Sequence, residues 1–330
     1  MRSGRHSRLI FKLLTTHMNA RERENLYSRK HKSTVFVERE TMIRKLFFVT
    51  LFMIAQSAVA APVVSTASAN ISFGNAPLMG VNLSGCEFIN NGALCPTVAS
   101  LNEYMDKGFN SFRIPFRGAQ AADPAVVKKL VAVATAAAAR GAYVILDRHD
   151  YGATFDAAQA AWWVSFAKNF PDTKYVMIDT MNEPSTGASY QPDAKTKKSY
   201  ASEVNAGIAA FRAAGMKHKL LIEWRGSSGM SRFDKGEAVT KACESPACSF
   251  DRSGGLKDPL GLTMVSGHRY FDLDGSGTSG VCDKRMSLLR MFVSNTDYNV
   301  QIRGLKVWVG EMAFGSAKRL DPWCKTVGGA

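Results

Sequence analysis

The chain has 330 residues, of which 46% are apolar, and a formal net charge of +14. This length allows one large or two ordinary domains with ample core, and the apolar fraction excludes both a disordered chain and a polytopic membrane protein. Residues 1–45 hold 12 of the 42 basic and 4 of the 28 acidic residues, so more than half of the net charge of +14 lies there. The remainder has no basic patch interleaved with stacking aromatics, and we expect no nucleic-acid partner.

The order of residues near the amino terminus predicts a secretory signal peptide. Residues 42–45 are short and basic, residues 46–55 are almost purely apolar, and residues 57–60 match an A-x-A cleavage site before Ala61. The apolar run is too short for a comfortable membrane span. We therefore expect a secreted protein, extracellular or periplasmic, with no membrane attachment after cleavage.

These features divide the chain into four parts. Residues 1–41 precede the signal peptide and are interpreted as an upstream artefact of start-site choice, with an unusually long leader as the alternative. Residues 42–60 form the signal peptide and residues 61–77 a linker. Residues 78–330 form one folded domain.

The cysteines fit an oxidising compartment. No pair has C-x-x-C spacing and no His or Cys cluster has the spacing of a zinc site, so we expect no metal. The simplest connectivity has the local bridges Cys86–Cys95 and Cys243–Cys248, with Cys282–Cys324 remaining. The sequence leaves the other connectivities open.

From residue 78 onward, predicted strands alternate with predicted helices. Strands are expected at 78–83, 111–116, 143–146, the run from 175 up to Asn182-Glu183-Pro184, 220–224, 262–266 and 305–309; helices are expected at 96–107, 123–140, 157–170, 200–214 and 284–294. This alternation predicts an α/β fold whose parallel sheet closes as a (β/α)8 TIM barrel.

Seven strands are recognisable rather than eight. Only 19 residues follow Glu311, and they contain no apolar run. We therefore expect a barrel that is truncated at its carboxyl end. Open strand edges expose backbone groups and an apolar flank, so such a chain is expected to be unstable and weakly active.

Polar side chains gather where the predicted strands end. They are Arg113 in the second strand, His149 after the third, Asn182 and Glu183 after the fourth, His268 and Tyr270 after the sixth, and Glu311 after the seventh. The carboxyl ends of barrel strands converge on one face, so these residues are expected to share one pocket. For the two histidines, this shared position favours the pocket over a purely structural role.

Two carboxylates facing each other across a pocket suit glycoside hydrolysis. One carboxyl must give a proton to the leaving oxygen, and the other must be ionised to attack the anomeric carbon. Arg113 near Glu311 would lower the pKa of that carboxyl and keep it nucleophilic. Glu183, in a more apolar setting, is expected to act as the acid and then as the base. Asn182 suits the sugar 2-hydroxyl, and Tyr270 suits a hydrogen bond to the nucleophile.

Six ordered motifs resemble glycoside hydrolase family 5, in particular its secreted endo-β-1,4-glucanases (cellulases). They are GVNLSG at 80–85, FRIPF at 112–116, LDRHDYG at 146–152, MNEP at 181–184, HRYFDLDGSGT at 268–278 and GE at 310–311, within roughly residues 78–315. The resemblance implies a retaining mechanism through a covalent glycosyl-enzyme, no cofactor and a β-glucan substrate. It makes Glu183 the acid/base and Glu311 the nucleophile, and it makes Arg113, His149, Asn182, His268 and Tyr270 supporting residues. The DGSGT loop points to the cellulase branch, and we expect a monomer.

The chain departs from the family pattern in three places. Asp150 stands where asparagine is usual, which adds a negative charge near the pocket. The loop after the fifth strand carries serines where a tryptophan is usual, and Trp224 is expected in the core. The last strand, with its tryptophan, is missing. Two alternatives stay open: another β-glycanase acting on mannan, xyloglucan or mixed-linkage glucan, and an inactive glucan-binding remnant of the same fold.

Overall fold

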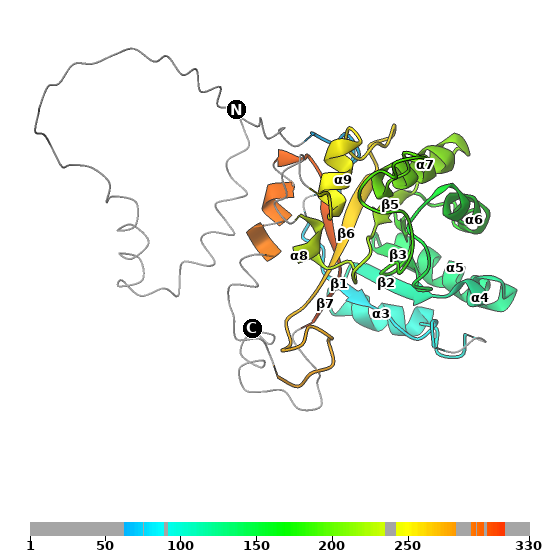
Figure 1. Ribbon diagram of the computed structural model, residues 1–330. Helices are drawn as coiled ribbons and strands as arrows, with labels where there is room; N and C mark the ends of the chain where they lie inside the picture. The colour runs from blue at the N-terminus through cyan, green and yellow to red at the C-terminus, as the bar shows by residue number, and fades with distance from the viewer. Residues whose placement is uncertain are drawn as a thin grey trace, which may run out of the picture. The chain divides into compact units, whose positions relative to one another are not determined.

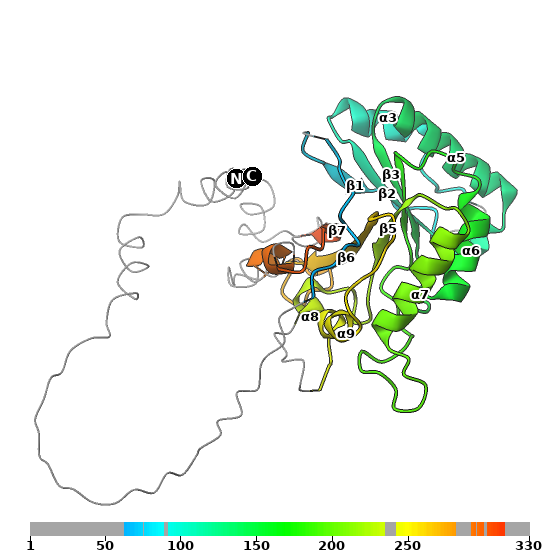
Figure 2. The same ribbon diagram turned by 90° about the horizontal axis from the view of Figure 1, so that it is seen from above.

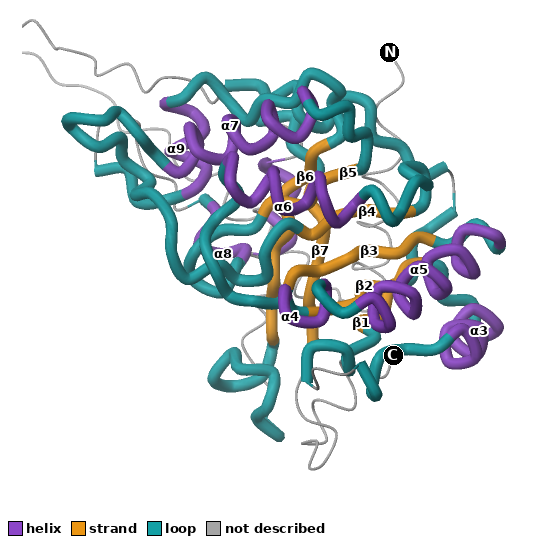
Figure 3. The backbone as a smooth tube through the Cα atoms, turned by 90° about the vertical axis from the view of Figure 1, so that its right-hand side faces the viewer, coloured by secondary structure: helices purple, strands orange, loops and turns teal. Residues whose placement is uncertain are grey.

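A computed structural model describes residues 63–313, apart from 75, 89–91, 235–241, 282–291, 295 and 300–301 (Figure 1). Seven parallel strands form one sheet in chain order: β1 (Gly80–Asn82), β2 (Ser111–Phe116), β3 (Tyr143–Arg148), β4 (Val176–Asp179), β5 (Lys219–Ile222), β6 (Thr263–Tyr270) and β7 (Val307–Ala313). Each strand pairs with the next one along the chain. The sheet curls into a nearly closed barrel (Figure 3). The predicted TIM-type barrel with seven recognisable strands is confirmed, and the expected truncation concerns residues beyond 313, outside the described part.

Helices connect the strands and lie along the outer side of the sheet. They are α3 (Val98–Asp106), α4 (Gly118–Ala121), α5 (Pro124–Ala139), α6 (Ala157–Ala167), α7 (Tyr200–Ala213), α8 (Met230–Phe233) and α9 (Pro246–Arg252). Figure 2 shows α3, α5, α6 and α7 on that outer side. The start of α5 illustrates the local cause, because Asp123 accepts a hydrogen bond from the amide of Ala125 and Pro124 occupies the first turn. The helix predicted at 284–294 lies largely outside the described residues.

The strands place alternate side chains on opposite faces of the sheet. One face packs against the helices, through residues such as Val144 and Ile178. The other face fills the barrel with Ile145, Met177, Leu221 and Met264, which form one apolar cluster. A buried acidic residue stands two positions after three of them: Asp147 after Ile145, Asp179 after Met177 and Glu223 after Leu221. The barrel interior therefore has an apolar layer with a charged layer on its carboxyl side.

The segment expected to be a linker, 61–77, is packed against the barrel in much of its described part. Ala67 and Ile71 are buried. The Ser68 hydroxyl donates to the carbonyl of Thr263 at 2.7 Å and accepts the amide of Lys306 at 3.0 Å. The linker prediction is therefore wrong for these residues. Small and polar residues without periodicity predict a linker. Here, however, the segment forms hydrogen bonds to the start of β6 and to the residue before β7.

Two disulfide bonds, Cys86–Cys95 and Cys243–Cys248, are present as in the simplest predicted connectivity. Cys282 and Cys324 lie outside the described residues. Among the helices described, none combines the length and the apolar character needed to cross a bilayer.

Candidate active site

Arg113 on β2 lies at the centre of the charged layer, with 3% of its side chain exposed. Its Nη1 donates to Glu311 Oε1 at 2.7 Å and to Asn82 Oδ1 at 3.4 Å. Its Nη2 donates to Asn182 Oδ1 at 2.8 Å. One guanidinium therefore orients the expected nucleophile and the amide that precedes Glu183.

Three buried carboxyl groups surround the same guanidinium. Asp179 Oδ2 accepts from Nε at 2.9 Å, while Asp147 Oδ2 and Glu223 Oε1 lie 3.2 and 3.3 Å from Nη2. Burial alone would lower the pKa of Arg113, but these carboxylates and Glu311 outweigh it and raise the pKa well above its usual value. Burial raises the pKa of Asp179 well above its usual range, and the neighbouring Glu223 adds to the effect. Arg113 is thus a permanent buried cation that holds several carboxyl groups together.

Glu311 on β7 is held as a carboxylate. Burial would raise its pKa, but the cations His268 and Arg113 and a hydrogen bond from Tyr270 outweigh burial, so its pKa lies below the usual value. The Tyr270 hydroxyl donates to Glu311 Oε2, and burial together with this carboxylate raises the pKa of the phenol. Glu311 therefore has the charge state that a nucleophile needs.

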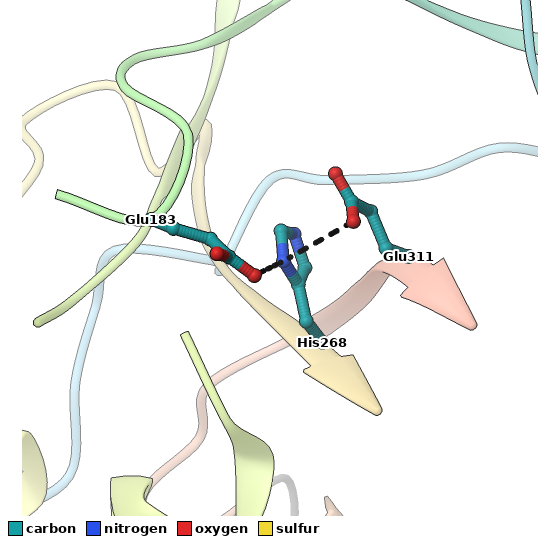
Figure 4. A group of neighbouring side chains, drawn as sticks. All are labelled: Glu183, His268 and Glu311. Carbon is teal, nitrogen blue, oxygen red and sulfur yellow. Dashed lines mark hydrogen bonds and ion pairs between the residues drawn. The ribbon is translucent and has the colours of Figure 1, made fainter. Parts of the chain in front are cut away.

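Glu183 follows β4 and faces Glu311 with His268 between them (Figure 4). His268 Nδ1 lies 3.0 Å from Glu183 Oε1 and 3.8 Å from Glu311 Oε2. Ligand atoms of these three side chains all lie within 4.8 Å of one another. Burial would lower the pKa of His268, but Glu223 and the other carboxylates raise it to about 10, so the ring is a cation at neutral pH. Only glycine fits at position 310, because a Cβ there would lie 2.7 Å from His268 Nε2.

His149 lines the site beside Asn182. Its Nδ1 lies 2.6 Å from Asp147 Oδ2, and its Nε2 lies 2.9 Å from the Tyr151 hydroxyl and 3.5 Å from Asn182 Nδ2. Burial would lower the pKa of His149, but the hydrogen bond and charge of Asp147 raise it. Asp147 thus sets the orientation of this ring, and the half-exposed Tyr151 extends the row outwards.

All seven residues predicted from strand ends meet in this one site: Arg113, His149, Asn182, Glu183, His268, Tyr270 and Glu311. The prediction did not include the buried carboxyl groups of Asp147, Asp179 and Glu223. Their signal was present, because an acidic residue that ends a run of buried strand residues needs a charged partner inside the fold.

Two departures from the family pattern can be located. Asp150 pairs with Arg148 Nε at 2.7 Å and accepts the amide of Gly118, so a cation matches its charge. Trp224 is fully buried and its ring centroid lies 4.8 Å from that of Phe233, which confirms its place in the core.

The model of the cellulase family, glycosyl hydrolase family 5, matches residues 72–327. The chain belongs to this family. Over 261 residues it is 28% identical to a "Probable endo-beta-1,4-glucanase B" of Aspergillus oryzae, covering 72% of this chain and 71% of that protein. It is 29% identical to the "Endo-beta-1,4-glucanase B" of Emericella nidulans, covering 57% of this chain but only 55% of the relative.

Solved structures of the family agree with this membership. A mutated endo-beta-1,4-glucanase from Xanthomonas axonopodis pv. citri is 26% identical, with a TM-score of 0.60 over 74% of this chain and 80% of that one. XacCel5A in complex with cellopentaose is also 26% identical, with a TM-score of 0.61 over 75% of this chain and 81% of that one.

Proposed function

We propose that the chain is an endo-acting hydrolase of β-1,4-glucosidic bonds that retains the configuration of the anomeric carbon. The supporting observation is the pair Glu183 and Glu311, whose facing carboxylate oxygens lie within 4.8 Å of each other. Retaining glycosidases hold their carboxyl groups about 5–5.5 Å apart, whereas inverting ones leave about 6.5–9.5 Å for a water molecule. The short separation favours direct attack by Glu311.

In the first step, a carboxylate oxygen of Glu311 attacks the anomeric carbon and forms a glycosyl ester. The bond from that carbon to the leaving oxygen breaks, and Glu183 gives its proton to this oxygen, which leaves as a sugar hydroxyl. Arg113 and Tyr270 fit this step, because they hold Glu311 ionised and oriented before attack.

In the second step, Glu183 takes a proton from a water molecule whose oxygen attacks the same carbon. The ester bond breaks, Glu311 leaves as a carboxylate and Glu183 is again protonated. His268 contacts both glutamates and is a cation, so it can stabilise the site while negative charge moves between them. Asn182 precedes Glu183 in the chain, His149 lies beside Asn182, and both suit contacts with the sugar hydroxyls.

A β-glucan is the substrate class that the relatives favour, since their printed names are endo-beta-1,4-glucanases and one solved relative holds cellopentaose. We propose that residues 42–60 direct export and are removed before Ala61. The two disulfide bonds suit the oxidising compartment that export implies.

The test is hydrolysis by the full chain and by two variants, Glu183→Gln and Glu311→Gln. We expect reducing sugar from carboxymethylcellulose with the unaltered protein and a loss of about 1,000-fold or more with each variant. Proton NMR of cellopentaose hydrolysis should show the β-anomer as the first product.

The control is Glu203→Gln, because Glu203 binds the amide of Ala188 without touching the catalytic pair. Faster cleavage of mannan, xyloglucan or mixed-linkage glucan would assign another β-glycanase. Binding of glucan without cleavage of any glycan would leave the non-catalytic alternative.

A further inference from the structure

Glu223, directly after β5, has a carboxylate that is fully buried and surrounded by donors. Its Oε2 accepts the backbone amide of Glu183 at 2.7 Å and the hydroxyl of Ser228 at 2.6 Å. Its Oε1 lies 3.1 Å from His268 Nε2 and 3.3 Å from Arg113 Nη2. A buried carboxylate is stable only when it is paired and hydrogen-bonded, and here both oxygens are.

The residue held by this carboxylate has an unusual backbone. Glu183 has a φ of +38°, in the left-handed region that side chains other than glycine rarely adopt. Such a conformation persists only where its surroundings impose it. The Glu183 amide donates to the Glu223 carboxylate, and this charge-assisted bond holds the backbone at the strained residue itself.

Glu223 also reaches the side chain of Glu183 through His268. One ring nitrogen of His268 faces Glu223 and the other lies 3.0 Å from Glu183 Oε1. Burial would raise the pKa of Glu223, but His268, Arg113 and Ser228 lower it to about 2, so it is a carboxylate throughout the working range of pH. The backbone and the carboxyl group of Glu183 are thus tied to one buried anion.

The loop after β5 is folded to support the same anion. Gly226, Ser227 and Ser228 have successive positive φ values of 93°, 56° and 43°, which turn the chain back on itself. Ser228 then donates to Glu223, and its carbonyl accepts the amide of His268 at 2.8 Å. Ser228, one of the serines that depart from the family pattern, therefore makes a side-chain contact that a tryptophan could not make.

We propose that Glu223 is a positioning residue for the acid/base: it fixes the backbone of Glu183 and, through His268, aims its carboxyl group at the leaving oxygen. This role rests on the proposed retaining mechanism and assigns Glu223 no contact with the substrate. The competing role is that of a counter-ion for Arg113, which would serve the nucleophile Glu311 instead.

The leaving group of the substrate separates these two roles. A dinitrophenolate departs without a proton, whereas a phenolate or a sugar needs the general acid. Glu223→Gln keeps the size of the side chain. Its NH2 group, however, must face one of two pairs of donors: Glu183 and Ser228, or His268 and Arg113. We expect kcat/KM for phenyl β-cellobioside to fall about 100-fold or more, and that for 2,4-dinitrophenyl β-cellobioside to fall less than about 10-fold.

Ser228→Ala provides a milder variant should Glu223→Gln fold poorly. It removes one donor to Glu223 without touching Glu183 or Glu311, and we expect a smaller loss that is again larger for the phenyl substrate. Glu203→Gln is the matched control, since Glu203 also binds a backbone amide of the β4–α7 loop, at Ala188, but lies outside the charged layer. It should not change the ratio of the two rates.

Equal losses on both substrates, in Glu223→Gln and Ser228→Ala alike, would overturn the positioning role and favour the counter-ion role. A crystal structure of Glu223→Gln gives a readout that does not need activity: we expect the φ of residue 183 to leave the left-handed region. An unchanged Glu183 in that structure would overturn the inference. This readout holds even if the unaltered protein proves inactive, whereas inactivity of the unaltered protein would by itself refute the proposed glucanase function.

Discussion

At the scale of single residues, the two glutamates of the site, Glu183 and Glu311, have different surroundings. Glu311 contacts Arg113 and Tyr270, and both favour its ionised form. Glu183 has neither contact and shares His268 with Glu311. This difference supports the proposed retaining mechanism, which needs a carboxylate to attack and a second carboxyl group to carry a proton.

The fall of kcat/KM on the acid side of its pH profile tests whether Tyr270 helps to keep Glu311 ionised. Tyr270→Phe removes a hydrogen bond that lowers the pKa of Glu311, so the pKa should rise. Because Glu311 must be ionised to attack, kcat/KM should be lost at a higher pH on acidification, by about 1 pH unit. The measurement is the pH dependence of kcat/KM on phenyl β-cellobioside.

Tyr190→Phe is the control for this experiment, because its hydroxyl donates to the carbonyl of Arg225 and does not contact Glu311. An acid limb that stays in place in Tyr270→Phe would mean that Arg113 and His268 alone hold Glu311 ionised.

The sequence predicted the residues that line the site and missed the buried carboxyl groups behind them. Glu183, His268 and Glu311 belong to the quoted motifs and follow apolar runs, so the barrel hypothesis brings them together. Asp179 and Glu223 acquire their meaning only through contact with Arg113, which comes from a different strand. That contact depends on the stagger of the strands around the barrel, which the pattern of one chain segment does not contain.

At the scale of elements, β6 and β7 are longer than the apolar runs that predicted them. The run predicted at 262–266 extends to Tyr270 in β6, with an irregular register between Gly267 and His268. The run predicted at 305–309 extends to Ala313 in β7. Both strands continue through residues that face the site rather than the core. Polar side chains there resemble a loop in sequence, although the backbone still pairs.

One buried ion pair anchors α7 to the turn before β6. Arg212 donates from Nε and Nη2 to the two carboxylate oxygens of Asp258, each at 2.9 Å. Asp258→Ala leaves a buried guanidinium without its partner, so we expect the free energy of unfolding to fall by about 3–5 kcal/mol. Urea denaturation at neutral pH measures this change.

The exposed pair of Arg140 and Asp106 provides the comparison. Its side chains are 41% and 68% exposed, so Asp106→Ala should change the free energy of unfolding by less than about 1 kcal/mol. Burial would raise the pKa of Asp258, but Arg212 lowers it, so its contribution is present above the usual aspartate pKa and is lost as the pH falls through the lowered value. Similar costs for the two variants at neutral pH would show that burial does not govern the Arg212 pair.

At the scale of the whole molecule, the two ends of the barrel are held by different contacts. Arg113 contacts residues of β1, β3, β4 and β7, so the charged layer links the two edge strands of the nearly closed barrel at the carboxyl ends of the strands. The opposite end is held by the segment around Ser68, which joins Thr263 at the start of β6 to Lys306 before β7. Stability and catalysis can therefore be altered separately.

A chain that starts at Gly74 should test this separation against one that starts at Val63. Among the contacts that the shorter chain loses are the buried Ile71 and the two hydrogen bonds of Ser68. Burial of such a side chain stabilises by about 1.5–3 kcal/mol and each hydrogen bond by about 0.5–1.5 kcal/mol. These contributions add to about 2.5–6 kcal/mol, which corresponds to a Tm lower by about 5–24 °C for a domain of this size.

Activity of the shorter chain should be retained well below its Tm, since none of the lost contacts reaches the carboxyl ends of the strands. The kcat on phenyl β-cellobioside at 20 °C should therefore stay within about 2-fold of the longer chain, because catalytic geometry rather than global stability sets this rate. An equal Tm for the two chains would restore the linker interpretation of residues 61–77. A large loss of kcat with little change in Tm would mean that the segment controls the geometry of the charged layer from the far end of the barrel.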